Sequence, residues 1–202
     1  MIRIRRWSVP ALAAAALLGS LTLSAPAVAA TATAPAVAAT ATAPAGDTAL
    51  VQEQDQRAGA PKITRAEEIR RAKVWLTANG GRPVPYSRQK VWKDGYRQDC
   101  SGYASMALGL PKSGPNTVKL KNGGWTKPIR MSELRQGDLV IKANSDDPRQ
   151  RHVVIFDGWN SGHTSYRSYE QAGSVGTRHT SHDYGLKSGD GYHAYRPVNL
   201  SD

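Results

Sequence analysis

Hydrophobic and polar residues alternate along four stretches in the C-terminal half of the chain. These stretches, separated by turns rich in Gly, Asn and Asp, are residues 138–143 (DLVIKA), 152–159 (HVVIFDGW), 164–171 (TSYRSYEQ) and 192–198 (YHAYRPV). A period of two in segments rich in β-branched and aromatic residues is typical of β-strands. The pattern therefore predicts an antiparallel sheet in this half.

The region ahead of these strands has the pattern of helices. Residues 63–81 place apolar side chains at helical spacing, with a capping box that begins at Thr64 and an Asn-Gly-Gly stop signal. A second helix is predicted over residues 100–110, with Asp99 as its N-cap. Helices followed by antiparallel strands indicate the α+β fold class, with the helices packed on the sheet.

The N-terminal part of the chain has neither pattern. Residues 1–30 combine a basic start, a short apolar run and small residues, which predicts a secretory signal peptide rather than a membrane span. Residues 31–62 continue an Ala/Thr/Pro repeat and offer few large apolar side chains, so we expect a flexible spacer. Residues 63–202 are then one domain of a secreted, extracellular or cell-wall-associated protein.

The charge of the chain is strongly positive. Lys and Arg number 27 against 16 Asp and Glu, for a net charge of +11, and three of the arginines fall in the expected signal peptide. The basic residues form no run or helical stripe, so we do not expect nucleic acid as a partner. An exported basic protein fits anionic cell-wall polymers better. We also expect a monomer without a stable membrane anchor.

The chain contains one cysteine, Cys100, in the first turn of the second predicted helix. Thiols of exported proteins usually form disulfides, and this one has no partner within the chain. At the start of a helix, unpaired backbone N–H groups and the helix dipole stabilise a thiolate. The position favours a reactive nucleophile over a packed thiol or an intermolecular bridge.

A thiol nucleophile needs a base and a third group that orients the base. Of the five histidines, His152 is the best placed, because it begins the most apolar strand. If the Asp-Gly pair at 157–158 forms a hairpin, His163 lies opposite His152. If the strand continues and turns at 160–163, Glu170 lies opposite instead. We favour Glu170, because a carboxylate stabilises a charged imidazole more strongly, and keep His163 as the alternative.

Two further histidines, His179 and His182, lie close together in residues 176–185 (GTRHTSHDYG). No second cysteine and no neighbouring residues at metal-ligand spacing accompany them. We therefore expect a solvated loop here, and neither a metal nor a cofactor.

Three motifs, DCSGYASMAL, MSELRQGDLVI and HVVIFDGW, together resemble the NlpC family of cell-wall cysteine peptidases. The resemblance implies a papain-like fold of the NlpC/CHAP type, with Cys100 as nucleophile and His152 as base. It also implies that Tyr86 lies beside the oxyanion site and that Asp99 and Ser101 line the substrate groove. The implied reaction is hydrolysis of an amide bond in peptidoglycan stem peptides through a thioester on Cys100.

The chain departs from the family pattern at two places. SRQK follows Tyr86 where the family usually has a Gly-Gly pair. The family's third residue is often a histidine, which His163 would match, whereas YEQAG resembles the CHAP amidases and points to Glu170. Alternative functions are therefore a CHAP-like N-acetylmuramoyl-alanine amidase or a cross-bridge endopeptidase. An alternative of another class is a non-catalytic, basic wall-binding protein.

Overall fold

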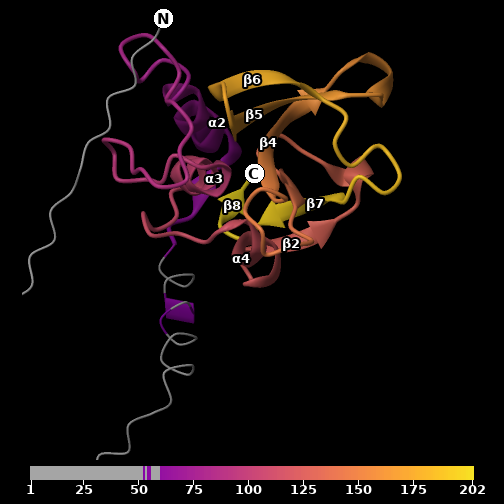
Figure 1. Ribbon diagram of the computed structural model, residues 1–202. Helices are drawn as coiled ribbons and strands as arrows, with labels where there is room; N and C mark the ends of the chain where they lie inside the picture. Colours follow the sequence, from indigo (N-terminus) through magenta and orange to yellow (C-terminus); the bar gives the residue numbers. More distant parts are fainter. Residues whose placement is uncertain (1–51, 53, 56–59) are drawn as a thin grey trace, which may run out of the picture. The chain divides into compact units, whose positions relative to one another are not determined.

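The computed structural model describes residues 52, 54–55 and 60–202. The expected signal peptide and most of the expected spacer lie outside these residues. Helices α2 and α3 lie on one side of an antiparallel sheet (Figure 1), which confirms the α+β fold class. Within the part of the chain described, no helix has both the length and the apolar character needed to cross a membrane.

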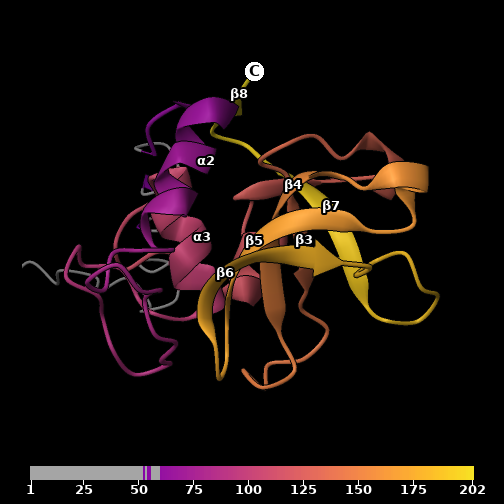
Figure 2. The same ribbon diagram turned by 90° about the horizontal axis from the view of Figure 1, so that it is seen from above.

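The main sheet has six strands in the order β2-β7-β3-β4-β5-β6, and all neighbours are antiparallel. Seen from above, α2 and α3 lie beside the strands (Figure 2). Two short strands form a separate parallel pair. The strands are β1 (Ile63–Thr64), β2 (Thr126–Ile129), β3 (Leu139–Lys142), β4 (His152–Trp159), β5 (Tyr166–Ala172), β6 (Gly176–His182), β7 (Tyr192–Pro197) and β8 (Leu200–Ser201). The four predicted strands are confirmed as β3, β4, β5 and β7.

Strand β6 corrects the loop expected at residues 176–185. It pairs with β5 along its whole length: Ala172 pairs with Gly176 at one end, and Tyr166 pairs with His182 at the other. Its polar composition hid the strand, because an edge strand is stabilised by backbone bonds to its neighbour and needs no apolar face of its own. The correction matters for the site, since a paired strand holds Arg178 and His182 in fixed positions.

The helices begin where the sequence predicted. In α2 (Arg65–Val74), the Thr64 hydroxyl accepts the Glu67 N–H at 3.2 Å. This helix ends earlier than expected, because Trp75 turns into the core and donates its indole N–H to Asp94 at 2.7 Å. The remaining helical elements are α3 (Cys100–Leu108), the unpredicted α4 (Thr117–Asn122), and the 3₁₀ turns η1 (Met131–Glu133) and η2 (Ser161–His163).

The core has two parts, one on each face of the sheet. The larger part fills the space between the helices and the sheet and includes Trp75, Tyr103 and Ile155. The smaller part lies on the other face around Val154 and Phe156. Both faces of β4 are therefore buried, which explains its continuous VVIF run and holds its first residue firmly in place.

The register of β4 and β5 decides which side chains meet. β4 runs through Trp159, and η2 makes the turn, as we favoured; the Asp-Gly pair at 157–158 forms a bulge and no hairpin. Ile155 pairs with Tyr169, two positions from the expected pairing, so His152 and Glu170 are diagonal neighbours rather than directly opposite. A shift of two residues keeps both side chains on one face, so they still meet.

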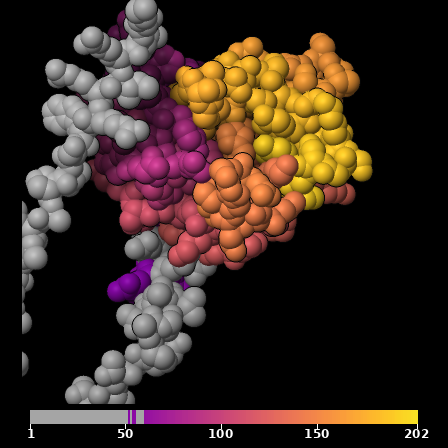
Figure 3. Space-filling model, viewed as in Figure 1, coloured from indigo at the N-terminus to yellow at the C-terminus, as the bar shows by residue number. Residues whose placement is uncertain are grey.

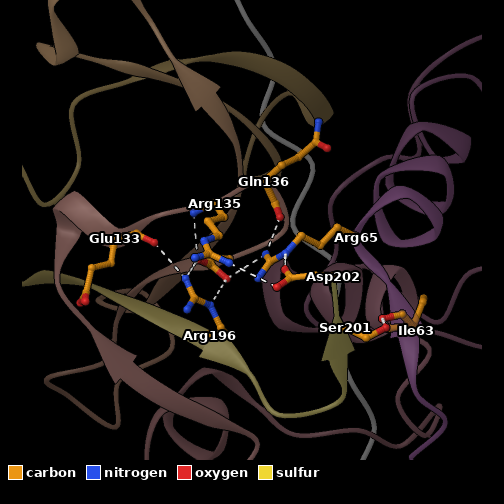
Figure 4. A network of polar contacts seen from close by, with 9 residues as sticks. Ile63, Arg65, Glu133, Arg135, Gln136, Arg196, Ser201 and Asp202 are labelled. Atoms are coloured by element: carbon orange, nitrogen blue, oxygen red, sulfur yellow. Dashed lines mark hydrogen bonds and ion pairs between the residues drawn. The ribbon is translucent and has the colours of Figure 1, made fainter.

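A buried carboxylate ties the helical side of the fold to the sheet. Asp138 is fully buried and accepts from Arg65 of α2 at 3.1 Å and from Arg196 of β7 at 2.8 Å. Arg65 also reaches Asp202 near the C-terminus, at 2.7 Å (Figure 4). The network fixes α2 and β7 against each other.

Candidate active site

Cys100 is the first residue of α3 because of the residues on either side of it. The Asp99 carboxylate caps the helix, accepting the Gly102 N–H at 2.6 Å and the Ser101 hydroxyl at 3.1 Å. A Cβ on Gly102 would collide with the carbonyl oxygen of Arg97, so only glycine allows this close approach. The D-C-S-G motif thereby sets the thiol in the first helical turn, largely buried.

The thiol has two polar neighbours from other elements. Its Sγ lies 3.7 Å from the hydroxyl of Thr117, the first residue of α4. On the sheet side its neighbour is the imidazole of His152, whose pKa the thiol raises. Helix and sheet thus meet at this sulfur.

His152 begins β4 and is bound on two sides. Its Nε2 lies 2.6 Å from Oε2 of Glu170, which leaves Nδ1 for Cys100. Burial disfavours the charged ring, but the hydrogen bonds with Cys100 and Glu170 outweigh burial and raise the pKa of His152 to about 9. At neutral pH the ring therefore holds a proton that it can transfer.

Glu170 is buried and has three donors. Besides His152, the Nε of Arg178 lies 2.5 Å and the Nε2 of His182 lies 2.9 Å from its other oxygen, Oε1. Burial alone would raise the pKa of Glu170, but the hydrogen bonds from the two imidazoles lower it well below its ordinary value. Glu170 is therefore a carboxylate, which only accepts, so both imidazoles carry a proton on Nε2.

An open cleft runs past the thiol and the imidazole. On the thiol side, a hollow of about 420 Å³ is lined by Cys100 and Thr117 among others. On the imidazole side, a second hollow of about 380 Å³ is lined by His152 and Tyr184 among others. Both share the walls Tyr86, Arg88, Pro148 and Arg151. Figure 3 shows the loop ahead of β4 (orange) at the surface between the purple-to-magenta segment and the yellow C-terminal part.

Three further side chains named from the sequence lie beside the thiol. Tyr86, Asp99 and Ser101 line the hollow on the thiol side. Burial, with the charges of Cys100 and Asp99, raises the pKa of Tyr86 to about 12, so its hydroxyl stays protonated and can donate.

His163 lies elsewhere. It belongs to η2, which follows the far end of β4 from His152, and its ring packs on Trp159 at 5.0 Å. The length of β4 separates the two histidines by roughly 20 Å. Of the two alternatives for the third residue, only Glu170 contacts His152.

Sequence reasoning missed His182, Arg178 and Thr117. Arg178 and His182 belong to β6. The signal that could have predicted this strand is its period of two, in which Arg178, Thr180 and His182 alternate with Thr177, His179 and Ser181. His179 points to the other face, where it bonds Asp157 at 2.8 Å. Among the described residues, no group of three or more His, Cys, Asp or Glu has the arrangement of a metal site.

No family model matches the sequence. No curated protein matches it either. Similar solved structures are proteins of the NlpC/P60 group. A lipoprotein-like NLP/P60 family protein from Staphylococcus aureus shares 20% identity over 66% of this chain and 41% of its own, with a TM-score of 0.43. An NlpC/P60 family protein from Bacillus cereus shares 17% over 69% and 42%, with a TM-score of 0.46.

The peptidoglycan hydrolase RipB from Mycobacterium tuberculosis shares 18% identity over 81% of this chain and 89% of its own, with a TM-score of 0.44. The chain spans about two fifths of the length of the Staphylococcus and Bacillus proteins. These similarities are too low to assign an activity, so the function is argued from the geometry of the site.

Proposed function

We propose that this chain is a secreted, papain-like cysteine amidohydrolase that cuts amide bonds in the peptide stems of peptidoglycan. One observation carries the proposal: a lone thiol at a helix start lies beside an imidazole that a buried carboxylate holds, and an open cleft runs past both. A wall-binding protein with a merely packed thiol would need neither His152 nor Glu170 at these places.

In the first half of the reaction, Sγ of Cys100 attacks the carbonyl carbon of the scissile amide. The tetrahedral intermediate collapses as the C–N bond breaks, and His152 gives its Nδ1 proton to the departing amine. The products are a free amine and a thioester on Cys100. In the second half, neutral His152 takes a proton from water, whose oxygen attacks the thioester. This step releases the acid and restores the thiolate and the charged imidazole.

The oxyanion of the tetrahedral intermediate needs donors. As the first residue of α3, Cys100 has a backbone N–H without an acceptor inside the helix. The protonated hydroxyl of Tyr86, on the shared wall of the cleft, supplies a second donor. Two such donors stabilise developing negative charge more than the neutral ground state.

The charge of the cleft supports an anionic substrate. Arg88 and Arg151 line both hollows, and Arg149 lines the imidazole side, where its partner is Asp147. Stem peptides carry free carboxylates beside their amide bonds, so a stem endopeptidase fits this surface. The second candidate function is an N-acetylmuramoyl-alanine amidase. It is favoured by Glu170, because the CHAP amidases resemble this chain in carrying a glutamate at that position.

The test is mass spectrometry of the fragments that the purified chain releases from peptidoglycan, with Cys100→Ala alongside. We expect new peptide termini that are absent with the variant, and these termini identify the bond. The thermal midpoint of Cys100→Ala should stay close to that of the unchanged chain, because the substitution removes one small buried atom. Release by both proteins, or by neither on walls of several chemistries, contradicts the proposal.

A further inference from the structure

The carboxylate of Glu170 uses its two oxygens differently. Oε2 faces His152, while Oε1 accepts from Arg178 and from His182. A carboxylate can rotate about its last bond, so something must keep Oε2 on the imidazole that does the chemistry. The side chain best placed to do this is His182.

His182 is held more firmly than its position near the end of an edge strand would suggest. Its side chain is 8% exposed, and its ring stacks on Tyr184 with centroids 4.2 Å apart. Tyr184 stacks in turn on Tyr192 at 4.3 Å, and its ring meets His152 edge-on at 6.3 Å. The aromatic stack fixes the direction of the His182 donor.

Arg178 is the competitor for Glu170. It lies directly opposite Glu170 in the β5–β6 register, and its side chain is 43% exposed. A guanidinium can bind both oxygens of a carboxylate in a fork-to-fork pair. Such a pair would draw Oε2 away from His152, unless another donor anchors Oε1 where it is.

We propose that His182 is a positioning residue, which anchors Oε1 of Glu170 so that Oε2 stays on His152. The role rests on the proposed function, since it serves the proton transfer by His152. His182 itself lines neither hollow of the cleft, so it acts through Glu170 and not on the substrate.

The charged and titratable groups around this pair come from every neighbouring element. They are Cys100 from α3, Lys142 from β3, Arg149 and Arg151 from the loop ahead of β4, Glu170 from β5, Arg178 and His182 from β6, Asp183 and Tyr184 from the following loop, and Tyr192 from β7. Of these, Glu170 is the acceptor that His152 and His182 share.

Two substitutions of His182 distinguish the effect of its N–H donor from the effect of its stacked ring. His182→Phe keeps an aromatic ring on Tyr184 and removes the donor; His182→Gln removes the ring and keeps an N–H donor near the position of Nε2. We expect kcat on peptidoglycan to fall roughly tenfold to hundredfold in His182→Phe with KM nearly unchanged. His182→Gln should stay much closer to the unchanged chain.

A second measurement does not depend on any substrate. NMR titration of the His152 ring nitrogens should give a midpoint at about pH 9 in the unchanged chain. In His182→Phe, the midpoint should fall below about pH 8, because a buried imidazole that loses its carboxylate loses its proton more readily. In His182→Gln it should stay near 9.

His179→Phe is the matched control. His179 is also on β6, bonds a carboxylate (Asp157) and stacks on a tyrosine (Tyr169, 4.0 Å), but it does not contact Glu170. It should leave kcat and the His152 midpoint unchanged.

The outcomes separate the two proposals. A lower midpoint in His182→Phe alone supports the positioning role even if peptidoglycan is not cut, in which case only the proposed function fails. An unchanged midpoint in His182→Phe overturns the positioning role, whether or not the chain cuts peptidoglycan. Loss in His182→Gln with retention in His182→Phe also overturns it, since the ring alone would then matter.

Discussion

At the scale of single residues, the imidazole of His152 lies between the thiol of Cys100 and the carboxylate of Glu170, to which it is hydrogen-bonded, so that three elements meet here. These groups shift the pKa values of one another. Glu170 and Cys100 together raise the pKa of His152 to about 9, and the imidazoles of His152 and His182 keep Glu170 ionised. The imidazole therefore carries a proton at neutral pH, which the proposed mechanism would pass to the leaving amine.

The third residue of the site can be tested by comparing two substitutions of similar size. Glu170→Gln keeps the shape and removes the charge that stabilises protonated His152, so we expect kcat to fall roughly a hundredfold or more. His163→Gln should leave kcat close to that of the unchanged chain, because His163 contacts Trp159 and not His152. Steady-state kinetics on peptidoglycan check both. The reverse order would assign the orienting role to His163.

The pH dependence follows from the same contacts. The pKa of His152 is raised from its ordinary 6.5 to about 9. Its contribution to folding stability is therefore complete below about pH 6.5 and is lost as the pH rises through about 9. We expect kcat to fall above about pH 9, because neutral His152 cannot protonate the amine. A pH–rate profile with its alkaline limb near 6.5 would contradict this.

At the scale of elements, the start of α3 places the thiol of Cys100 and the start of β4 places the imidazole of His152. Asp99, Gly102 and Gly109 are local signals, and the structure uses Asp99 and Gly109 as the caps of α3. The buried run in β4 likewise signals a strand. Strand β6 lacks such signals, because its stability comes from pairing with β5 rather than from its own sequence. Helix α4 does have caps, Asn116 and Gly123, but with six residues it is too short to be stable without its neighbours.

Removing a helix cap should therefore affect activity only where the helix carries the thiol. Asp99→Ala and Thr64→Ala each remove an N-cap, so each should lower the free energy of unfolding by about 1 kcal/mol. Only Asp99→Ala should also lower kcat, because it loosens the first turn that holds Cys100. Urea unfolding and peptidoglycan assays on both variants check this. Equal activities would mean that the cap does not position the thiol.

At the scale of the whole described domain, the helices and the sheet must hold a fixed separation for Cys100 to reach His152. The core between them fixes this distance. The buried Asp138 adds charged contacts that tie α2 to β7. A substitution that removes these ion pairs would therefore affect the site only by destabilising the fold.

Two carboxylates of this network differ in burial and should differ in effect. Asp138→Ala leaves Arg65 and Arg196 without their buried partner, and we expect it to lower the free energy of unfolding by about 3 to 5 kcal/mol. Asp202→Ala removes a carboxylate that is 71% exposed, so water screens its ion pairs and the free energy of unfolding should change far less. Chemical denaturation measures both. A similar cost for the two would contradict the burial argument.

The sequence by itself determined the fold class, the helix that starts at the cysteine, and the strand that starts at His152, because caps and periodicity are local properties. It also indicated Glu170 as partner of His152, since a register error of two residues preserves the face of a strand. Only the tertiary structure decided the bulge at the Asp-Gly pair, strand β6, and the placement of Arg178 and His182 on Glu170. These depend on pairing between segments, whose free energy no single segment contains.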